Sequence, residues 1–296
     1  MCSSDLNGGK SRIFNTTLTG CDVAVTQTAG ELEIISNILT GNDVAVNVTG
    51  GKTNIAYNLI YNNAKFGLVY VGDDVVFNDN WWATNDEPLR ANGENLSDDY
   101  FDVYRLEEDA GVDEFSYLTL KFTSTASVMG TNKEYPVTVM LTNDGNEIEG
   151  YIKTIDLTIN DDYLVTLENN QGTFTIKTPD TQSENTILTV LNQEYALNVP
   201  VLAETNVIVS VVGEPIADGS VDVKVEVPYA TGNVTFYVNG KSASRELNEN
   251  IAEYAIDNLT AGNYSIVVVY GGDDVFDSIV NTTSFNVEPS EDLTAL

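Results

Sequence analysis

The amino-terminal part of the chain repeats itself about every 21 residues. Full copies begin at Ile13 (IFNTTLTGCDVAVTQTAGELE), Ile34 (IISNILTGNDVAVNVTGGKTN) and Ile55 (IAYNLIYNNAKFGLVYVGDDV), and a partial copy begins at Val76. A period of about 20–29 residues is typical of solenoids, in which each repeat buries its apolar face against the next. This periodicity constrains the fold because equivalent side chains of successive repeats must stack on one another.

Two kinds of solenoid have repeats of this length. A leucine-rich repeat needs a fixed L-x-x-L-x-L frame and a helical or 3₁₀ segment. The repeats here contain short β-branched segments separated by Gly, Asn and Thr, and they lack a period of about 3.6 residues. The pattern therefore favours a parallel β-helix with three short strands per coil and neighbouring coils about 4.8 Å apart.

The repeat also predicts which side chains stack inside the β-helix. The third copy gains a residue near Asn62–Asn63 and loses one before Val76, which keeps the period. Three ladders are expected: an apolar one of Ile13, Ile34, Ile55 and Val76, a second of Leu18, Leu39, Ile60 and Trp81, and a polar one of Thr16, Asn37, Asn58 and Asp79 at a corner. Trp81 and Trp82 are expected to cap the stack, with a sugar-stacking platform as the alternative.

The charge balance excludes several kinds of partner. The 296 residues carry 13 Lys and Arg against 45 Asp and Glu, which gives a net charge of −32. Such a surface repels nucleic acid and anionic lipid.

The sequence has no histidine, which rules out Ser-His-Asp and Cys-His catalysis. Cys2 and Cys21 are the only cysteines; a bridge between them is left open, and Cys21 is otherwise expected to be buried or in a turn.

The coils are followed by Asn80-Trp81-Trp82-Ala83-Thr84-Asn85. This combination resembles the adhesin-like surface proteins of methanogenic archaea, whose right-handed, pectate-lyase-like β-helix repeats end on an Asn-Trp-Trp-Gly-Thr-Asn type of segment. Ala83 stands where that pattern has glycine. The resemblance implies an extracellular protein of an archaeal cell surface, and it implies that the β-helix is right-handed.

Beyond the coils, the chain changes character. Residues 86–110 are rich in acidic residues and are expected to form a connector with one helical turn around Tyr100–Leu106. From Val112 on, apolar and polar residues alternate between closely spaced turns, which favours an immunoglobulin-like β-sandwich. Asn143-Asp144-Gly145-Asn146 predicts a hairpin turn. The expected strands are Tyr117–Phe122, Val137–Leu141, Gly150–Ile155, Leu164–Leu167, Thr173–Lys177, Thr186–Leu191 and Ala196–Val199.

A second sandwich is predicted from Pro200–Glu204 on. Asn239-Gly240 is a type I′ turn signal. The segment Leu259–Tyr264 matches the tyrosine-corner pattern, in which the hydroxyl group of Tyr264 would bond to nearby backbone. The text from Gly232 on resembles bacterial and archaeal Ig-like repeats of large surface proteins. The expected strands are Val207–Val212, Val221–Val227, Val234–Val238, Tyr254–Ile256, Ser265–Tyr270 and Ser284–Val287.

The predicted fold class is therefore all-β, with the C-terminal coils of a right-handed parallel β-helix followed by two Ig-like β-sandwiches. The expected domains are residues 1–85 (coils), 86–110 (connector), 111–202 and 203–289 (sandwiches) and 290–296 (linker).

No catalytic, cofactor-binding or metal-binding residue is predicted. The carboxylate pairs are expected to be solvated turn acids, with weak calcium binding as the alternative: Asp73-Asp74, Asp98-Asp99, Asp161-Asp162 and Asp273-Asp274.

The rival hypothesis is a carbohydrate-active remnant, a pectin-type lyase or hydrolase, because such enzymes use β-helices. The cations of the coils are Lys10, Arg12, Lys52 and Lys65, and none is expected in phase with an acidic cluster.

Residues Met1–Lys10 contain no signal peptide, and no stretch is long and apolar enough to insert in a membrane. We expect a fragment whose export and anchoring signals lie elsewhere. The predicted function is a non-enzymatic, extracellular adhesin or stalk piece whose partners are glycans or other cell surfaces, not nucleic acid or membrane.

Overall fold

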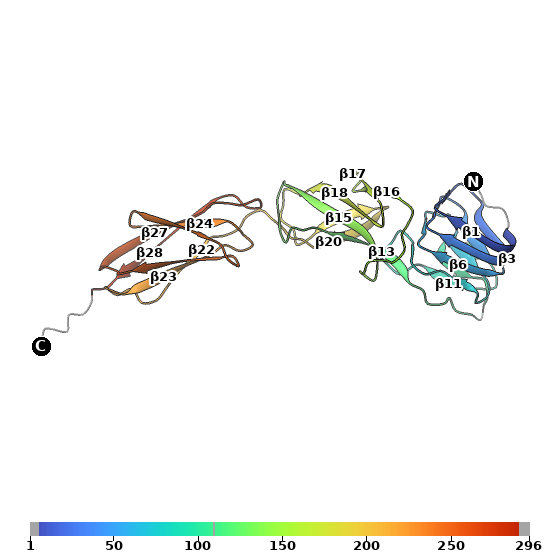
Figure 1. Cartoon of the computed structure of the whole chain (residues 1–296), viewed down its shortest axis with the longest axis horizontal. Coiled ribbons are helices and arrows are strands. Elements are labelled where there is room, and N and C mark those ends of the chain that lie inside the picture. The colour runs from blue at the N-terminus through green and yellow to red at the C-terminus, as the bar shows by residue number, and fades with distance from the viewer. Residues whose placement is uncertain (1–5, 109, 290–296) are drawn as a thin grey trace. The chain divides into compact units, whose positions relative to one another are not determined.

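The computed structural model describes residues 6–108 and 110–289, and these ranges form strands joined by turns (Figure 1). Within them no helix exists, and so none that could cross a membrane. The chain divides into two compact units. The first contains the residues up to Thr125, Pro136–Ile176 and Ile187–Leu197; the second contains Ala126–Tyr135, Lys177–Thr186 and the residues from Asn198 on. The expected linker, 290–296, lies outside the described residues.

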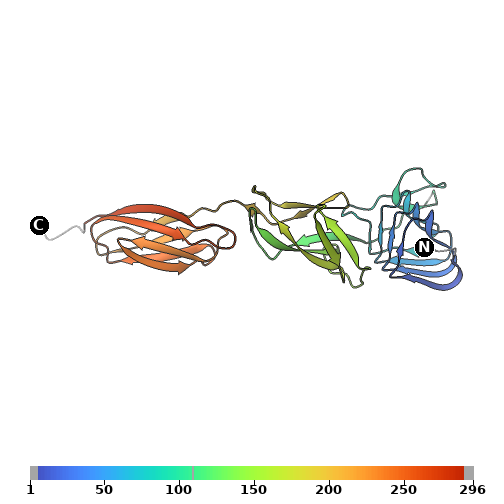
Figure 2. The same cartoon turned by 90° about the horizontal axis from the view of Figure 1, so that it is seen from above.

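The first unit begins with a solenoid, as the repeat predicts. Its strands pair in parallel from coil to coil, and Figure 2 shows the coils stacked one beside the next. The long strand β3 bends at a corner and therefore contributes to two faces. The strands are β1 (Leu6–Phe14), β2 (Thr17–Leu18), β3 (Val23–Ile35), β4 (Ile38–Thr40), β5 (Val44–Val48), β6 (Lys52–Ala56), β7 (Leu59–Tyr61), β8 (Phe66–Tyr70), β9 (Val75–Val76) and β10 (Asn80–Trp81).

The predicted apolar ladders are confirmed in the first three coils. Ile13 lies beside Ile34 and Ile34 beside Ile55, and the last two are fully buried. Leu18, Leu39 and Ile60 form the second ladder. Each such side chain contributes about 1.5–3 kcal/mol by leaving water, so the stacked interior is the main source of stability for the solenoid.

The fourth coil corrects the predicted register. Val76 pairs with Asn54 and is 48% exposed, whereas Phe77 is buried in the solenoid interior. In the same way, Trp81 pairs with Leu59 on the outward side, and Trp82 takes the interior place predicted for Trp81. The residue gained in the third copy is thus not lost before Val76. Because side chains alternate between faces, this slip of one residue exchanges inside for outside.

A ladder of buried asparagines fixes one corner of the solenoid. The Nδ2 group of Asn37 donates to Oδ1 of Asn58 at 3.0 Å, and Nδ2 of Asn58 donates to Oδ1 of Asn80 at 2.9 Å. Each Oδ1 also accepts the backbone N–H of the coil before it. Asn80 therefore occupies the position predicted for Asp79. A second, shorter ladder joins Asn42 to Asn63.

Residues 86–110 join the solenoid sheet instead of only connecting it. They contain β11 (Arg90–Asn92) and β12 (Phe101–Arg105), and β12 pairs in parallel with β8. The prediction of a helical turn around Tyr100–Leu106 was wrong. Val103 lies in the solenoid interior and its neighbour Tyr104 in the outward cluster with Phe66, which is the alternation of a strand.

The solenoid continues directly into the middle sandwich. Strand β13 (Tyr117–Thr123) pairs in parallel with β10 and antiparallel with β15 (Glu134–Asn143). With β18 (Gln171–Lys177), one sheet therefore has the order β18-β15-β13-β10-β7-β4-β2. Outward side chains form a ladder across the junction: Ile38, Leu59, Trp81 and Leu118, all buried. One β-sheet therefore belongs to both structures.

The second sheet of the middle sandwich has the order β17-β16-β19-β20. The predicted strand Gly150–Ile155 was wrong, since the strand begins only at Ile155. The turn at Asn143–Asn146 is confirmed by a bridge between these two residues. The strands are β16 (Ile155–Ile159), β17 (Tyr163–Leu167), β18 (Gln171–Lys177), β19 (Thr186–Val190) and β20 (Gln193–Leu197).

The second unit is built on an antiparallel sandwich. Its sheets are β22-β23-β26 and β25-β24-β27-β28, and the short strands β14 (Met129–Gly130) and β21 (Val201–Leu202) pair with each other. The sequence prediction missed β25, whose residues are mostly exposed. The strands are β22 (Ile208–Val212), β23 (Ser220–Glu226), β24 (Asn233–Val238), β25 (Lys241–Glu246), β26 (Ile251–Asp257), β27 (Gly262–Tyr270) and β28 (Ile279–Val287).

Two local predictions are confirmed in this sandwich. Asn239 and Gly240 have φ angles of 46° and 81°, as a type I′ turn between β24 and β25 requires. The backbone N–H of Thr260 donates to the hydroxyl oxygen of Tyr264 at 3.1 Å, and Tyr264 is buried. This bond pins the chain at the start of β27 and forms a tyrosine corner.

Replacing Asn58 by alanine should destabilise the first unit by about 3 kcal/mol, because the buried N–H of Asn37 and the carbonyl of Ile34 lose their partner. Urea unfolding followed by tryptophan fluorescence measures this, since both tryptophans lie in that unit. Asn54→Ala is the control: Asn54 is exposed on the same coil and should change stability by less than about 0.5 kcal/mol. Equal losses of unfolding free energy in the two variants would show that the asparagine ladder does not stabilise the first unit.

Tyr264→Phe should lower the stability of the second unit by about 1 kcal/mol, because it removes the partly buried hydrogen bond between the N–H of Thr260 and the hydroxyl group of Tyr264. Circular dichroism during urea unfolding provides the measurement. Tyr237→Phe removes a hydroxyl group from a side chain that is 47% exposed and should have no measurable effect. A Tyr264→Phe variant as stable as the parent would show that the tyrosine corner does not stabilise the second unit.

Candidate functional site

The three faces of the solenoid differ in what covers their outward side chains. On the face of β4, β7 and β10, Ile38, Leu59 and Trp81 are buried. On the face of β5, β8 and β12, Phe66 and Tyr104 are buried in a cluster with residues of the 91–106 segment. The face of β1, β3, β6 and β9 differs, because its outward side chains are exposed in every coil. We call it the open face; it consists of Lys10, Arg12, Glu31, Glu33, Lys52, Asn54 and Val76.

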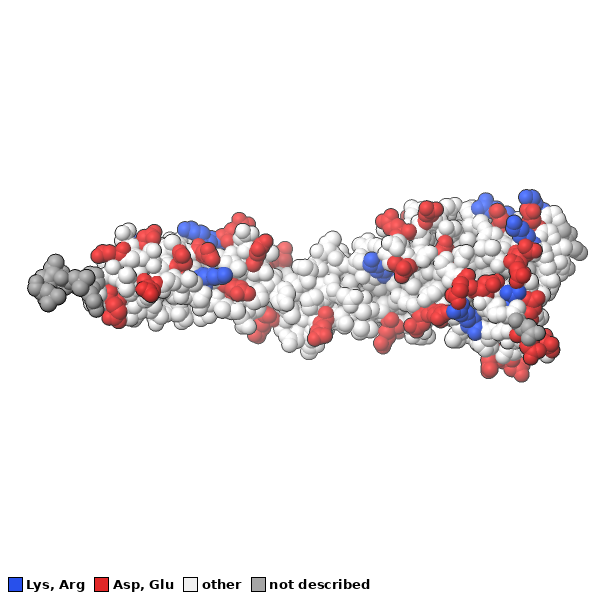
Figure 3. All heavy atoms as spheres, turned by 90° about the horizontal axis from the view of Figure 1, so that it is seen from below, with Lys and Arg blue, Asp and Glu red and all other residues white. Residues whose placement is uncertain are grey.

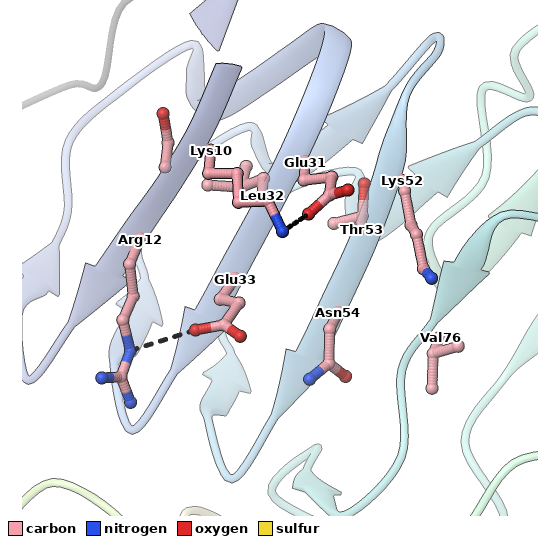
Figure 4. A pocket seen from close by; sticks show the side chains of 10 residues that line it. Lys10, Arg12, Glu31, Leu32, Glu33, Lys52, Thr53, Asn54 and Val76 are labelled. Carbon is pink, nitrogen blue, oxygen red and sulfur yellow. Dashed lines mark ion pairs between the residues drawn. The ribbon is translucent and has the colours of Figure 1, made fainter. Parts of the chain in front are cut away.

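The open face follows from the alternation of its strands. Leu32, Ile34 and Ile55 point into the solenoid, so the residues between them, among them Glu31, Glu33 and Asn54, point to solvent. The parallel register then sets Lys10, Glu31 and Lys52 in one row and Arg12, Glu33 and Asn54 in the next (Figure 4). A shallow hollow of about 550 Å³ lies over these rows.

Two ion pairs cross the open face between neighbouring strands. Nζ of Lys10 lies 2.6 Å from Glu31, and Nε of Arg12 lies 3.4 Å from Glu33. The guanidinium group of Arg12 also lies 4.5 Å from the ring centre of Phe14. The expectation that no cation is in phase with an acidic cluster was therefore wrong. The sequence contains the signal for this pair, because Lys10 and Glu31 are one repeat of 21 residues apart.

The ion pair sets the charge states of this face. The hydrogen bond from Lys10, and then its charge, lowers the pKa of Glu31, and Lys52 lowers it further. The same pair raises the pKa of Lys10. Both side chains are therefore charged over the whole neutral range. A general acid of a glycosidase needs a raised pKa, whereas the pKa of Glu31 is lowered.

Lys65 does not belong to the open face. It precedes β8, and its carbonyl oxygen accepts the N–H of Phe101 at the start of β12. Three of the four cations that the sequence analysis singled out thus gather on one face. The chain has 13 basic and 45 acidic residues, and acidic side chains outnumber basic ones on the surface in view in Figure 3.

The carboxylate pairs are engaged in different ways. Asp73 binds Nη2 of the buried Arg105 at 2.6 Å. Asp273 accepts the N–H groups of Thr231, Val275 and Phe276, all at 2.8 Å, and despite some burial these bonds lower the pKa of Asp273. The expectation of solvated turn acids was thus wrong for Asp273, whereas the Asp73 side chain is 87% exposed and fits it. No group of three or more acidic or cysteine side chains in the described ranges is arranged to hold a metal ion.

Neither tryptophan offers a surface for stacking on a sugar. Trp81 is fully buried, and Trp82 is 4% exposed. Trp82 closes the solenoid interior together with Phe115, whose ring centre lies 6.3 Å from that of Trp82. The capping prediction is confirmed for Trp82 alone. Cys21 is buried as expected, and Cys2, its counterpart in the bridge that the sequence left open, lies outside the described residues.

Comparisons with known proteins found likeness in structure only. No family model and no curated protein sequence matches the chain. Similar solved structures include FdeC, an Escherichia coli adhesin, with 13% identity and a TM-score of 0.29 over 59% of this chain and 66% of that chain. The human OSCAR ligand-binding domain has 10% identity and a TM-score of 0.31 over 58% and 97%. At such scores the likenesses do not define a function.

A third similar structure is SGBP-B of the mixed-linkage glucan utilization locus of Bacteroides ovatus, in complex with a mixed-linkage heptasaccharide. It has 14% identity and a TM-score of 0.22 over 56% of this chain and 46% of that chain.

Replacing Glu31 by glutamine should return the pKa of Lys10 toward its ordinary value, because the largest causes of the rise come from Glu31. NMR titration of the lysine ε-methylene groups measures this. Glu33→Gln is the control, since Glu33 is the smallest of the causes at Lys10, and it should change that pKa much less. A Lys10 titration unchanged by Glu31→Gln would show that the pair does not form in solution.

Proposed function

We propose that this chain is a non-enzymatic piece of an extracellular, cell-surface adhesin and that the open face contacts its ligand, a glycan or another cell surface. The single observation that supports this is the contrast between the three solenoid faces. Two are covered by other parts of the chain, whereas the third presents aligned charged and polar side chains on β1, β3 and β6 and the exposed Val76 on β9. An archaeal, methanogen-type origin remains part of the proposal and rests on the sequence resemblance.

The architecture suits presentation of a surface. Since β13 continues the solenoid sheet, the middle sandwich holds the coils through backbone hydrogen bonds as well as side chains. Further contacts reinforce the junction: the hydroxyl group of Ser36 donates to the carbonyl of Tyr151 at 2.6 Å, and the rings of Phe14 and Tyr151 meet edge to face. The sandwiches then act as spacers, and the open face is the solenoid face that they leave uncovered.

A second candidate function has one observation in its favour. Cations and carboxylates share rows on the open face, Lys10 with Glu31 and Arg12 with Glu33. A pectin-type lyase would use a basic residue beside carboxylates, and a hydrolase would use two carboxylates. Incubation of the chain with polygalacturonate and with neutral pectic side chains separates the candidates. Release of unsaturated or reducing sugars, lost in Arg12→Ala and Glu33→Gln, would replace the adhesin proposal by an enzyme.

Reversing the charge at Lys10 and Lys52 should reduce ligand binding by about tenfold or more, because two exposed cations of the open face become acids beside Glu31. Glycan arrays and adhesion to intact cells measure the loss. The matched control is Lys241→Glu with Lys224→Glu, which makes the same charge change on the second unit and should leave binding intact.

Three results bear on this proposal. Binding that is lost only in the open-face variant supports it. Binding that both double variants reduce equally would show that net charge, not this face, matters. A folded chain that binds no glycan and no cell would favour a stalk without a ligand. Weak calcium binding stays a prediction, and calcium titration of the same samples tests it.

A further inference from the structure

A second hollow, of about 550 Å³, lies in the first unit beside the fourth coil. It is separate from the open face and shares no residue with it. We call it the loop pocket. The residues that line it come from the β7 corner, the loop after β10, the start of β12 and the β19–β20 turn: Tyr61–Ala64, Trp82–Thr84, Asp86, Glu87, Leu89, Tyr100, Asp102, Leu191 and Gln193.

A fixed carboxylate lies at one wall of the loop pocket. Asp102 is 5% exposed; it accepts the N–H of Leu89 at 2.8 Å on Oδ2 and the hydroxyl group of Tyr100 on Oδ1. Burial raises the pKa of Asp102, although these two bonds oppose the shift. Each oxygen keeps a lone pair beyond the bond that it already accepts, so the carboxylate can accept a further donor without moving.

The remaining lining combines aromatic rings and neutral polar groups. Tyr61 and Tyr100 are each partly exposed, and Tyr61 is held by the ring of Trp81 at 5.9 Å. Asn62 and Gln193 are exposed and can both donate and accept hydrogen bonds. Ring faces beside a few directed polar groups, in a hollow of several hundred Å³, are the usual features of a small-molecule site.

The charges of the loop pocket restrict what it can hold. Its charged lining residues are all acidic: Asp86, Glu87 and Asp102. Arg90, which follows the lining residue Leu89, is bound to Glu87 at 2.5 Å and to Glu114 at 3.2 Å. An anionic ligand would therefore be repelled. A bare metal ion would lack a converging set of oxygen ligands, because no metal-type cluster occurs in the described part of the chain.

We infer that the loop pocket binds a neutral saccharide. The hydroxyl groups of a sugar donate to the carboxylates of Asp86 and Asp102 and exchange hydrogen bonds with Asn62 and Gln193. The apolar face of the sugar ring packs on the exposed side of Tyr61 or Tyr100. This names a ligand class for a site other than the open face, so it is tested independently of the proposed function.

The two tryptophans give this site its own signal. Trp82 lines the loop pocket and Trp81 supports Tyr61, and the chain contains no other tryptophan. The full chain is titrated with cellotetraose, mannotriose and N,N′-diacetylchitobiose, and with trigalacturonate as the anionic probe. We expect a saturable change of tryptophan fluorescence with at least one neutral probe at or below about 10 mM, and none with trigalacturonate.

Variants assign the signal to the pocket. Asp102→Asn keeps the size of the side chain and should weaken binding about tenfold, as should Tyr61→Ala. Because Asp102 is buried, the exposed pair Asp86→Ala and Gln193→Ala provides the fold-safe test, with a loss of about threefold or more expected in each. Tyr237→Ala, in the second unit, and the Lys10/Lys52 open-face variant are the controls and should bind as the parent does.

The inference fails in any of three cases. The first is that no neutral probe changes the tryptophan fluorescence up to about 10 mM. The second is that trigalacturonate binds more tightly than the neutral probes. The third is that the Asp86→Ala and Gln193→Ala variants bind the neutral probe as tightly as the parent does. Loss of cell adhesion in the open-face variant with intact saccharide binding would support both proposals separately, since the two sites use different residues.

Discussion

The hydrogen-bonded stacking of asparagines between coils is the interaction on which the rest of the first unit depends. Oδ1 of Asn58 accepts the backbone N–H of Asn37 in the coil before it, and Nδ2 of Asn58 donates to Oδ1 of Asn80 in the coil after it. One side chain thus holds three coils in register. A buried amide group without a hydrogen-bond partner costs free energy of folding, and a shift of register would leave several asparagine side chains unpaired at once. The ladder therefore allows only one alignment, and that alignment sets the charged rows of the open face.

The same alignment explains how the solenoid ends. An open stack of parallel strands would expose unpaired backbone groups and invite association with other chains. Here Trp82 and Phe115 fill the interior, while β13 pairs with the edge of β10. Trp81, on the opposite side of the strand, becomes part of the outward ladder that reaches Leu118. Neighbouring tryptophans thus serve two cores, one inside the solenoid and one between the solenoid and the sandwich.

The sequence predicted most of this fold, and its errors have physical causes. A strict period placed Ile34 on Ile55 correctly, because both copies have the same length. It misplaced Val76, since one extra residue in a corner costs a solenoid little but reverses every side chain that follows. The tyrosine corner was found because its determinants lie within a few residues of Tyr264, whereas β25 has too few apolar residues to show an alternating pattern.

The candidate sites were harder to predict because they depend on distant pairings. Arg12 and Glu33 become neighbours only through parallel strand register, and the loop pocket brings Tyr61, Asp102 and Gln193 together from separate parts of the chain. No local motif records such proximity.

Alternation gives the solenoid two nearly independent sets of positions. Inward residues such as Ile34 carry the stability, and outward residues such as Glu33 face solvent on the open face. A change at an outward position alters the surface without creating a cavity in the interior. Charge can therefore be arranged there for binding at little cost in stability. Lys10, Arg12 and Lys52 occupy outward positions, so the packing of the solenoid interior does not require them. Their presence on one face of a chain with 45 acidic and 13 basic residues therefore concerns the surface and not the core.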